Sequence, residues 1–143
     1  ATPANPLDLT GAVVNKPELF LDCMQVLEQD PAVSVLVCVF DVPTDLNNDW
    51  APFAVGSLQA IGRFKPQGRV RFLAISNTVK YVSDRSRAEI EAAGMPYLAS
   101  GLDVGMKALQ NALRWSALQR EGAIEAPTMP TEKTDYEECL ACQ

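Results

Sequence analysis

Apolar, β-branched blocks alternate along the chain with amphipathic blocks of helical period. Residues Val33–Phe40 are apolar on both faces and follow Asp30-Pro31, which is typical of a central strand of a parallel sheet. Residues Arg69–Ile75 form a second block of this kind. We expect two further short strands at Pro6–Leu9 and Pro96–Leu98.

Four amphipathic blocks predict helices, because each carries apolar side chains at helical spacing on one face. Pro17 suits a first helical turn, Gly94 suits a C-terminal cap, and Ser100-Gly101-Leu102-Asp103 is a capping-box pattern. The expected helices are Pro17–Gln29, Asp49–Arg63, Ser83–Ala93 and Leu102–Gln119. We expect the last helix to bury Leu102, Leu109, Ala112 and Leu113.

The alternation of strands and helices predicts an α/β domain, with a short parallel sheet of about four strands flanked by helices. We assign this domain to residues 1–121. Residues 122–143 carry five acids, one base and two prolines and lack apolar periodicity, so we expect an acidic linker or tail. Parallel sheets bind ligands beyond the carboxyl ends of their strands, so the site is expected in the loops there.

Composition excludes several classes of site. The 143 residues contain no histidine, which removes a Ser-His-Asp triad, an HExxH zinc site and a phosphohistidine carried by this chain. The net charge of −6 argues against a nucleic-acid surface, and the longest apolar run, Val35–Phe40, is too short to span a membrane. Neither GxGxxG nor GxxxxGK[ST] occurs, so neither dinucleotide nor P-loop chemistry is supported.

The four cysteines do not predict a metal or redox centre. Cys139 and Cys142 form one CxxC, which without a second pair or a histidine is weak support for zinc, and its role is left open. Cys23 and Cys38 fall on expected core faces, where cysteine packs as a small apolar side chain. Reduced thiols fit a cytoplasmic protein best.

The loop from Asp41 to Asn48 is long for a connection between a strand and a helix. The start of the following helix offers free N–H groups to an anion, but capping by Asn47 or Asn48 explains the pattern as well, and we favour capping. Asp41, Asp45 and Asp49 would repel an anion facing them. Their spacing matches no EF-hand, so we expect no metal site.

Four short motifs, in order, resemble a known family. Asn5-Pro6-Leu7-Asp8-Leu9-Thr10-Gly11 is similar to the N-P-[VL]-D-[LI]-x-G opening of a subdomain of the nucleoside-diphosphate-forming acyl-CoA synthetases, the superfamily of succinyl-CoA ligase. Residues 30–37 resemble its D-P-x-V-D-x-V-L-V, with one position fewer. Ala93-Gly94-Met95-Pro96-Tyr97 resembles its A-G-[IM]-P-Y, and a long helix follows Gly101-Leu102-Asp103-Val104. The likeness runs from Asn5 to about Trp115.

The resemblance implies a flavodoxin-like three-layer fold with helices on both faces of the sheet. It also implies a reaction that this chain carries out together with other domains. The family makes an acyl-CoA thioester from an organic acid, coenzyme A and ATP through a phosphohistidine. The resemblance implies that ATP, Mg and CoA bind elsewhere in the intact enzyme, and that this chain alone binds no cofactor. Its implied partners are the phosphohistidine-bearing and ATP-grasp domains, in cis or as a second subunit, together with a small organic acid.

The resemblance also implies particular site residues but no catalytic residue in this chain. Asn5 matches an asparagine at the shared substrate site, and Val42, Pro43 and Thr44 match a loop that contacts substrate and phosphate. The chain departs from the family at this loop, where Asp41-Val42 replaces a glycine pair. Pro43 has no N–H to donate, whereas Thr44 still offers a hydroxyl donor.

Two other functions stay open. A noncatalytic regulatory or scaffold protein that keeps the ligase-like fold would account for the lost glycines. An independent flavin or small-ligand module ranks last, because the chain has no phosphate-binding loop.

Overall fold

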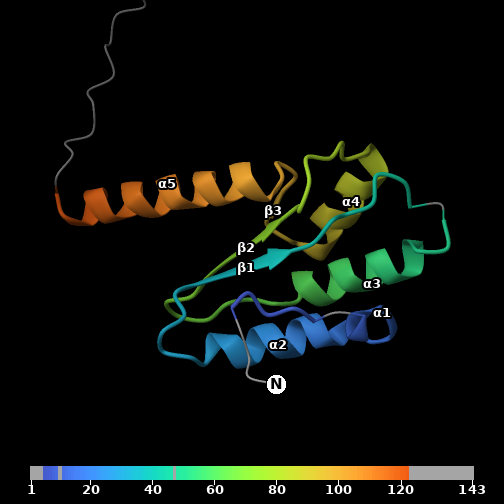
Figure 1. The fold of residues 1–143 in the computed structure, drawn as a ribbon, viewed down its shortest axis with the longest axis horizontal. Helices are drawn as coiled ribbons and strands as arrows, with labels where there is room; N and C mark the ends of the chain where they lie inside the picture. Colours follow the sequence, from blue (N-terminus) through green and yellow to red (C-terminus); the bar gives the residue numbers. More distant parts are fainter. Residues whose placement is uncertain (1–4, 10, 47, 123–143) are drawn as a thin grey trace, which may run out of the picture. The chain divides into compact units, whose positions relative to one another are not determined.

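The structure, a computed structural model, describes residues 5–9, 11–46 and 48–122. Its elements, in chain order, are α1 (Ala12–Asn15), α2 (Glu18–Glu28), β1 (Val35–Val39), α3 (Ala51–Gly62), β2 (Arg71–Ile75), α4 (Asp84–Ala93), β3 (Tyr97–Leu98) and α5 (Leu102–Arg120) (Figure 1). The chain divides into two compact units, residues 1–108 and 109–143. Their boundary falls within α5, and most of the expected linker, from residue 123, lies outside the described residues.

The first unit is an α/β structure with a parallel sheet, as the alternating pattern predicts. The strand order is β1-β2-β3, and both pairs are parallel. Leu36 lies opposite Phe72, and Ala74 lies opposite Tyr97. This arrangement is compatible with a flavodoxin-like fold.

The described sheet has three strands, not the four that the sequence predicts. Residues Pro6–Leu9 form no ladder, so the expected first strand is wrong. This short block contains a proline, which cannot donate to a ladder, and Leu7 is 43% exposed rather than packed. Among the described strands β1 therefore lies at one edge of the sheet, although its two-sided apolar pattern predicts a central strand.

One face of the sheet carries the core of the first unit. Leu36, Phe40 and Ala74 pack there with side chains of α2 and α3, including Met24, Leu58 and Ile61. Figure 1 shows α2 and α3 side by side beneath the strands. On the opposite face Ile75 is fully buried, and a Cβ added at Gly105 of α5 would press against it. Val39 on that same face is 45% exposed, so the helices leave part of this face of the sheet uncovered.

The helix ends follow the sequence signals closely in α4. The Ser83 hydroxyl caps its start by accepting a hydrogen bond from the Ser86 N–H, and Gly94 ends it in the left-handed conformation at φ 62°. In α5 the expected burial is only partly correct. Leu102 and Leu109 are half-buried, but Ala112 and Leu113 are exposed. None of the helices in the described part of the chain is long and apolar enough to cross a membrane.

Candidate functional site

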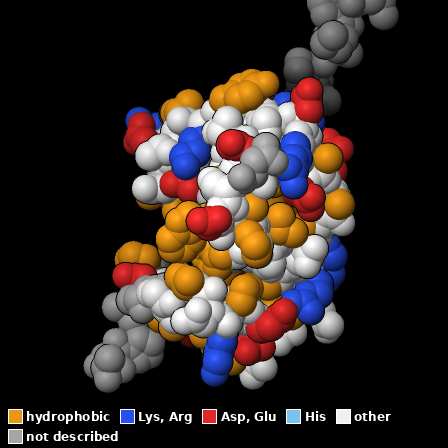
Figure 2. All heavy atoms as spheres, turned by 90° about the vertical axis from the view of Figure 1, so that its right-hand side faces the viewer, with side chains coloured by type: hydrophobic (Ala, Val, Ile, Leu, Met, Phe, Trp, Pro, Cys, Tyr) orange, Lys and Arg blue, Asp and Glu red, His pale blue; other side chains and the backbone are white. Residues whose placement is uncertain are grey.

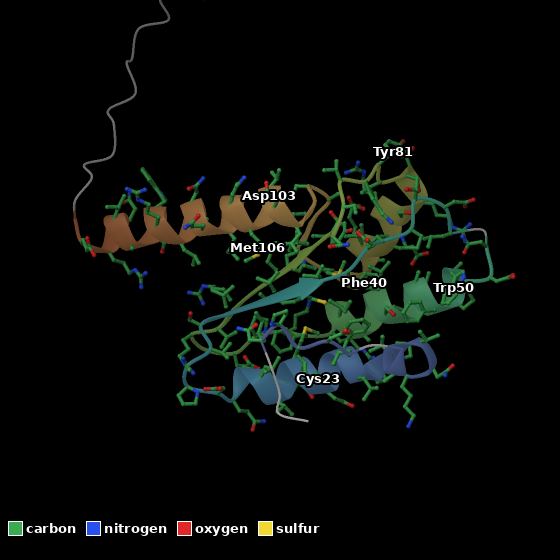
Figure 3. All side chains as sticks on the ribbon, viewed as in Figure 1. Cys23, Phe40, Trp50, Tyr81, Asp103 and Met106 are labelled. Atoms are coloured by element: carbon green, nitrogen blue, oxygen red, sulfur yellow. The ribbon has the colours of Figure 1, made fainter. Side chains whose placement is uncertain are left out.

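The loop that follows β1 is the part of the described chain on which most of the sequence-predicted site residues fall. It leaves the sheet after Phe40, whose side chain lies between the sheet and α3, and it leads to Trp50 at the start of α3 (Figure 3). Val42 is 2% exposed and Leu46 is also 2% exposed, so the loop is anchored by two buried apolar side chains. The described part of the loop is therefore attached to the core at these two positions.

Tyr97 of β3 fixes the first turn of this loop. Its hydroxyl donates to the carbonyl of Phe40 at 3.1 Å and accepts from the N–H of Val42 at 3.3 Å. Burial raises the pKa of the Tyr97 hydroxyl above its usual value, so the group stays protonated as a donor. Val42 belongs to the loop that, by the resemblance, contacts substrate and phosphate, and its N–H is thus already satisfied inside the protein.

Asp41 joins this loop to the loop after β2. One of its carboxylate oxygens accepts from the N–H of Asn77 at 2.9 Å and from the N–H of Thr78 at 3.4 Å. Its other oxygen lies 3.9 Å from the ammonium of Lys80. Successive backbone N–H groups of this kind bind anions in many proteins, and here the carboxylate of Asp41 takes that place.

Pro43 and Thr44 are held by α4 and by the loop that precedes it. The hydroxyl of Ser86, which is fully buried, donates to the carbonyl of Pro43 at 2.7 Å. The hydroxyl of Thr44 donates to the carbonyl of Tyr81 at 3.0 Å. Thr44 is exposed, so a ligand can reach it, but its hydroxyl must leave Tyr81 before it donates elsewhere.

The start of α3 offers few free donors to an anion. The Asn48 side chain accepts from the N–H of Trp50 at 3.0 Å, and the Asn48 carbonyl accepts from the N–H of Ala51 at 3.0 Å. Pro52, in the first turn, has no N–H. The expectation that an asparagine caps this helix is wrong for Asn48, because Trp50 stands at the N-cap and makes no side-chain cap hydrogen bond. The Asn48 side chain accepts instead from the N–H of Trp50, ahead of the first helical turn, and Asn47 lies outside the described residues.

The structure does not join Asn5 to the loop. Asn5 is exposed, and within residues 5–9, 11–46 and 48–122 no hydrogen bond connects it to Val42, Pro43 or Thr44. The three loop residues are adjacent, as their sequence positions require. The fourth predicted site residue therefore stands apart from them in the hydrogen-bond network.

A shallow apolar hollow of about 610 Å³ lies beside the start of α3. Five apolar residues and one carboxylate line it: Val14, Pro17, Trp50, Pro52, Phe53 and Asp49. Trp50 is 59% exposed and meets Phe53 edge to face, with ring centroids 6.1 Å apart. Figure 2 shows hydrophobic side chains gathered near the middle of the face that this end of the molecule presents, with charged side chains around them.

The described residues contain no group of three or more acidic or cysteine side chains arranged to hold a metal ion. Asp41, Asp45 and Asp49 therefore form no such cluster. Cys23 and Cys38 are free thiols; Cys38 packs against the core, as its position predicts, whereas Cys23 is half-buried on α2 and is not part of the core cluster. The CxxC at Cys139 and Cys142 lies outside the described residues.

Sequence reasoning located the loop but missed the side chains that hold it. Tyr97 is separated from Val42 by 55 residues, and Ser86 from Pro43 by 43. No local spacing predicts such pairs, because they arise only when parallel strands align their carboxyl ends. The role of Asp41 could have been predicted from its position, because a carboxylate at the end of a strand is suited to accept hydrogen bonds from neighbouring N–H groups.

Comparison of the chain with protein-family models, with curated proteins and with solved structures found no match.

Proposed function

We propose that this chain is a flavodoxin-like subdomain of a nucleoside-diphosphate-forming acyl-CoA synthetase. In the intact enzyme an organic acid, CoA and ATP with Mg would give an acyl-CoA thioester through a phosphohistidine on another domain. This chain then shapes the site at a domain boundary and supplies no catalytic residue. Its reduced thiols fit a cytoplasmic enzyme.

One contact carries the proposal. The resemblance rests on four short motifs, and two of them are separated by more than fifty residues. Tyr97, from the third motif, hydrogen-bonds to Phe40 and Val42, which follow the strand of the second motif. The motifs thus meet at the carboxyl ends of the strands, where an α/β sheet carries its functional loops. The burial of Ile75 beneath Gly105 adds support for helices on both faces.

The apolar hollow beside α3 supports a place at a domain boundary. Trp50 is 59% exposed beside the half-buried Phe53, so the hollow offers apolar surface that a neighbouring domain would cover. Trp50 and Phe53 adjoin the loop that the resemblance places next to the phosphohistidine domain. Packing of that domain on this end of the molecule would bury them.

The hydrogen-bond donors of the loop are already bound within the chain, which favours the second function, a noncatalytic regulatory or scaffold protein with a ligase-like fold. Asp41 occupies backbone donors of the neighbouring loop, Tyr97 occupies the Val42 N–H, and Tyr81 occupies the Thr44 hydroxyl. Each contact removes a donor that a phosphate would need. The two functions differ in whether thioester formation depends on these residues.

Thr44→Ala in the native full-length protein tests the residue roles. If the Thr44 hydroxyl serves the substrate or the phosphate, we expect acyl-CoA formation to fall about ten-fold, the effect of losing one charge-assisted hydrogen bond. Thr78→Ala is the matched control, because the structure uses only the backbone N–H of Thr78. Asn5→Ala is measured in parallel. Rates unchanged in Thr44→Ala and Asn5→Ala would refute the assigned roles and favour the scaffold.

A further inference from the structure

A second hollow, of about 440 Å³, opens between the loop after β2, helix α4 and strand β3. Its volume lies within the range of sites that hold small organic molecules, roughly 300–1,000 Å³. It is distinct from the hollow beside α3, with which it shares no lining residue. Tyr81, labelled in Figure 3, is one of the residues that line it.

The hollow has an apolar floor. Met95, which is 5% exposed, lines it together with Ile90 and Tyr97. The Tyr97 hydroxyl is already engaged with Phe40 and Val42, so Tyr97 contributes its ring rather than a hydrogen-bonding group. A ligand would therefore place an apolar body on this floor. Covering the floor would cost little, because it presents no polar group that would lose its hydrogen bonds to water.

Two cations and one carboxylate surround this floor. The Lys80 side chain is one-third exposed, and its ammonium lies 3.9 Å from a carboxylate oxygen of Asp41. Within the part of the chain that the structure describes, the Arg87 guanidinium makes no ion pair. Glu91 lies one turn further along α4. The residues that line the hollow carry one net positive charge, and Asp41 beside Lys80 offsets part of it, so Arg87 is the group that favours an anion over a cation here.

We propose that this hollow binds a small organic carboxylate with an apolar body. The guanidinium of Arg87 and the ammonium of Lys80 hold the carboxylate, and Met95, Ile90 and the ring of Tyr97 contact the body. Glu91 weakens the binding by repulsion and excludes doubly charged anions. The site does not depend on the acyl-CoA synthetase proposal, because every group that it uses belongs to this chain.

Titration of 4-phenylbutyrate into the ¹⁵N-labelled 143-residue chain tests the site directly. We expect saturable amide shifts confined to residues 80–82 and 87–99. Two control compounds separate the contributions: 4-phenylbutylamine keeps the body and reverses the charge, and inorganic phosphate keeps a negative charge without the body. Both are expected to bind more weakly than 4-phenylbutyrate. Equal or tighter binding of either compound overturns the proposal, as does the absence of saturable shifts with 4-phenylbutyrate.

Three variants identify the groups that hold the carboxylate. Arg87→Gln is expected to weaken 4-phenylbutyrate binding about ten-fold, as the loss of one charge-assisted hydrogen bond does. Glu91→Gln is expected to tighten it up to about five-fold, since it removes an exposed like charge. Lys16→Gln makes the same change of net charge outside the hollow and is expected to leave the affinity unchanged. Equal affinities in Arg87→Gln and Lys16→Gln would overturn the assignment.

Discussion

The Tyr97 hydroxyl and the Asp41 carboxylate determine which polar groups of the loop after β1 remain available. Each satisfies backbone groups that neither the helices nor the strands satisfy. Their partners lie far away in the sequence, so the motif that contains Tyr97 could be recognised, but its contact with Val42 could not be predicted. The position of the loop at a strand end, by contrast, followed directly from the pattern of apolar residues.

Tyr97→Phe should destabilise the fold. The Val42 N–H and the Phe40 carbonyl would lose their partner in a half-buried place, so we expect a loss of about 1–2 kcal/mol in the free energy of unfolding. Urea unfolding measures this loss. Tyr81→Phe is the matched control, because the Tyr81 side chain is 73% exposed, and it should change stability by less than about 0.5 kcal/mol. Equal effects of the two substitutions would contradict the bridging role of Tyr97.

Cys38 should make the fold less stable in alkali. Burial raises the pKa of its thiol from 9.0 to about 12, so the unfolded chain releases a proton that the folded chain keeps. The contribution of the Cys38 thiol to the free energy of unfolding is constant below about pH 9 and falls as the pH rises from about 9 to about 12. Between about pH 8 and about pH 11, the native sequence should lose on the order of 2 kcal/mol more than Cys38→Ala.

Urea unfolding at a series of pH values, with Cys23→Ala beside Cys38→Ala, gives this comparison. Cys23→Ala should keep the alkaline loss of the native sequence. If Cys38→Ala lost as much stability in alkali as the native sequence does, the raised pKa of Cys38 would not be the cause.

Helices and strands were predictable where local chemistry sets their ends, as Ser83 and Gly94 do for α4. The number and order of the strands were not predictable in the same way. The two-sided apolar pattern of β1 indicates a central strand, yet β1 lies at the edge of the described sheet with Val39 partly exposed. The sequence pattern shows which residues are apolar. How many of them are buried depends on how elements distant in the sequence pack against them.

The contact between α3 and α4 depends on a glycine. A Cβ added at Gly62 would overlap the backbone carbonyl of Ala93, whereas one added at Gly56 would meet only the Pro17 ring, at 3.4 Å. We therefore expect Gly62→Ala to destabilise the fold by about 1–3 kcal/mol, the usual cost of overpacking. Gly56→Ala, in the same helix, should be near neutral or stabilising by up to about 1 kcal/mol. Thermal unfolding of both variants compares them, and similar melting temperatures would refute the close approach.

The chain as a whole combines a firmly held loop with surfaces that its own helices leave uncovered. Trp50 at the start of α3 and Val39 on the outer face of the sheet are both exposed. Such a distribution fits a domain that acts beside others, which is the central claim of the proposed function. The absence of histidine is compatible with this claim, because such a chain could serve a phosphohistidine enzyme only beside a domain that carries the histidine.

The most direct test is an assay of thioester formation by the native protein purified through this chain, together with its intact mass. The account predicts acyl-CoA formation that depends on ATP and CoA with at least one organic acid. It also predicts a phosphorylated histidine, on a chain much heavier than 15.5 kDa or on a co-purifying subunit. A preparation with neither thioester formation nor phosphohistidine would contradict the account and leave the scaffold function in its place.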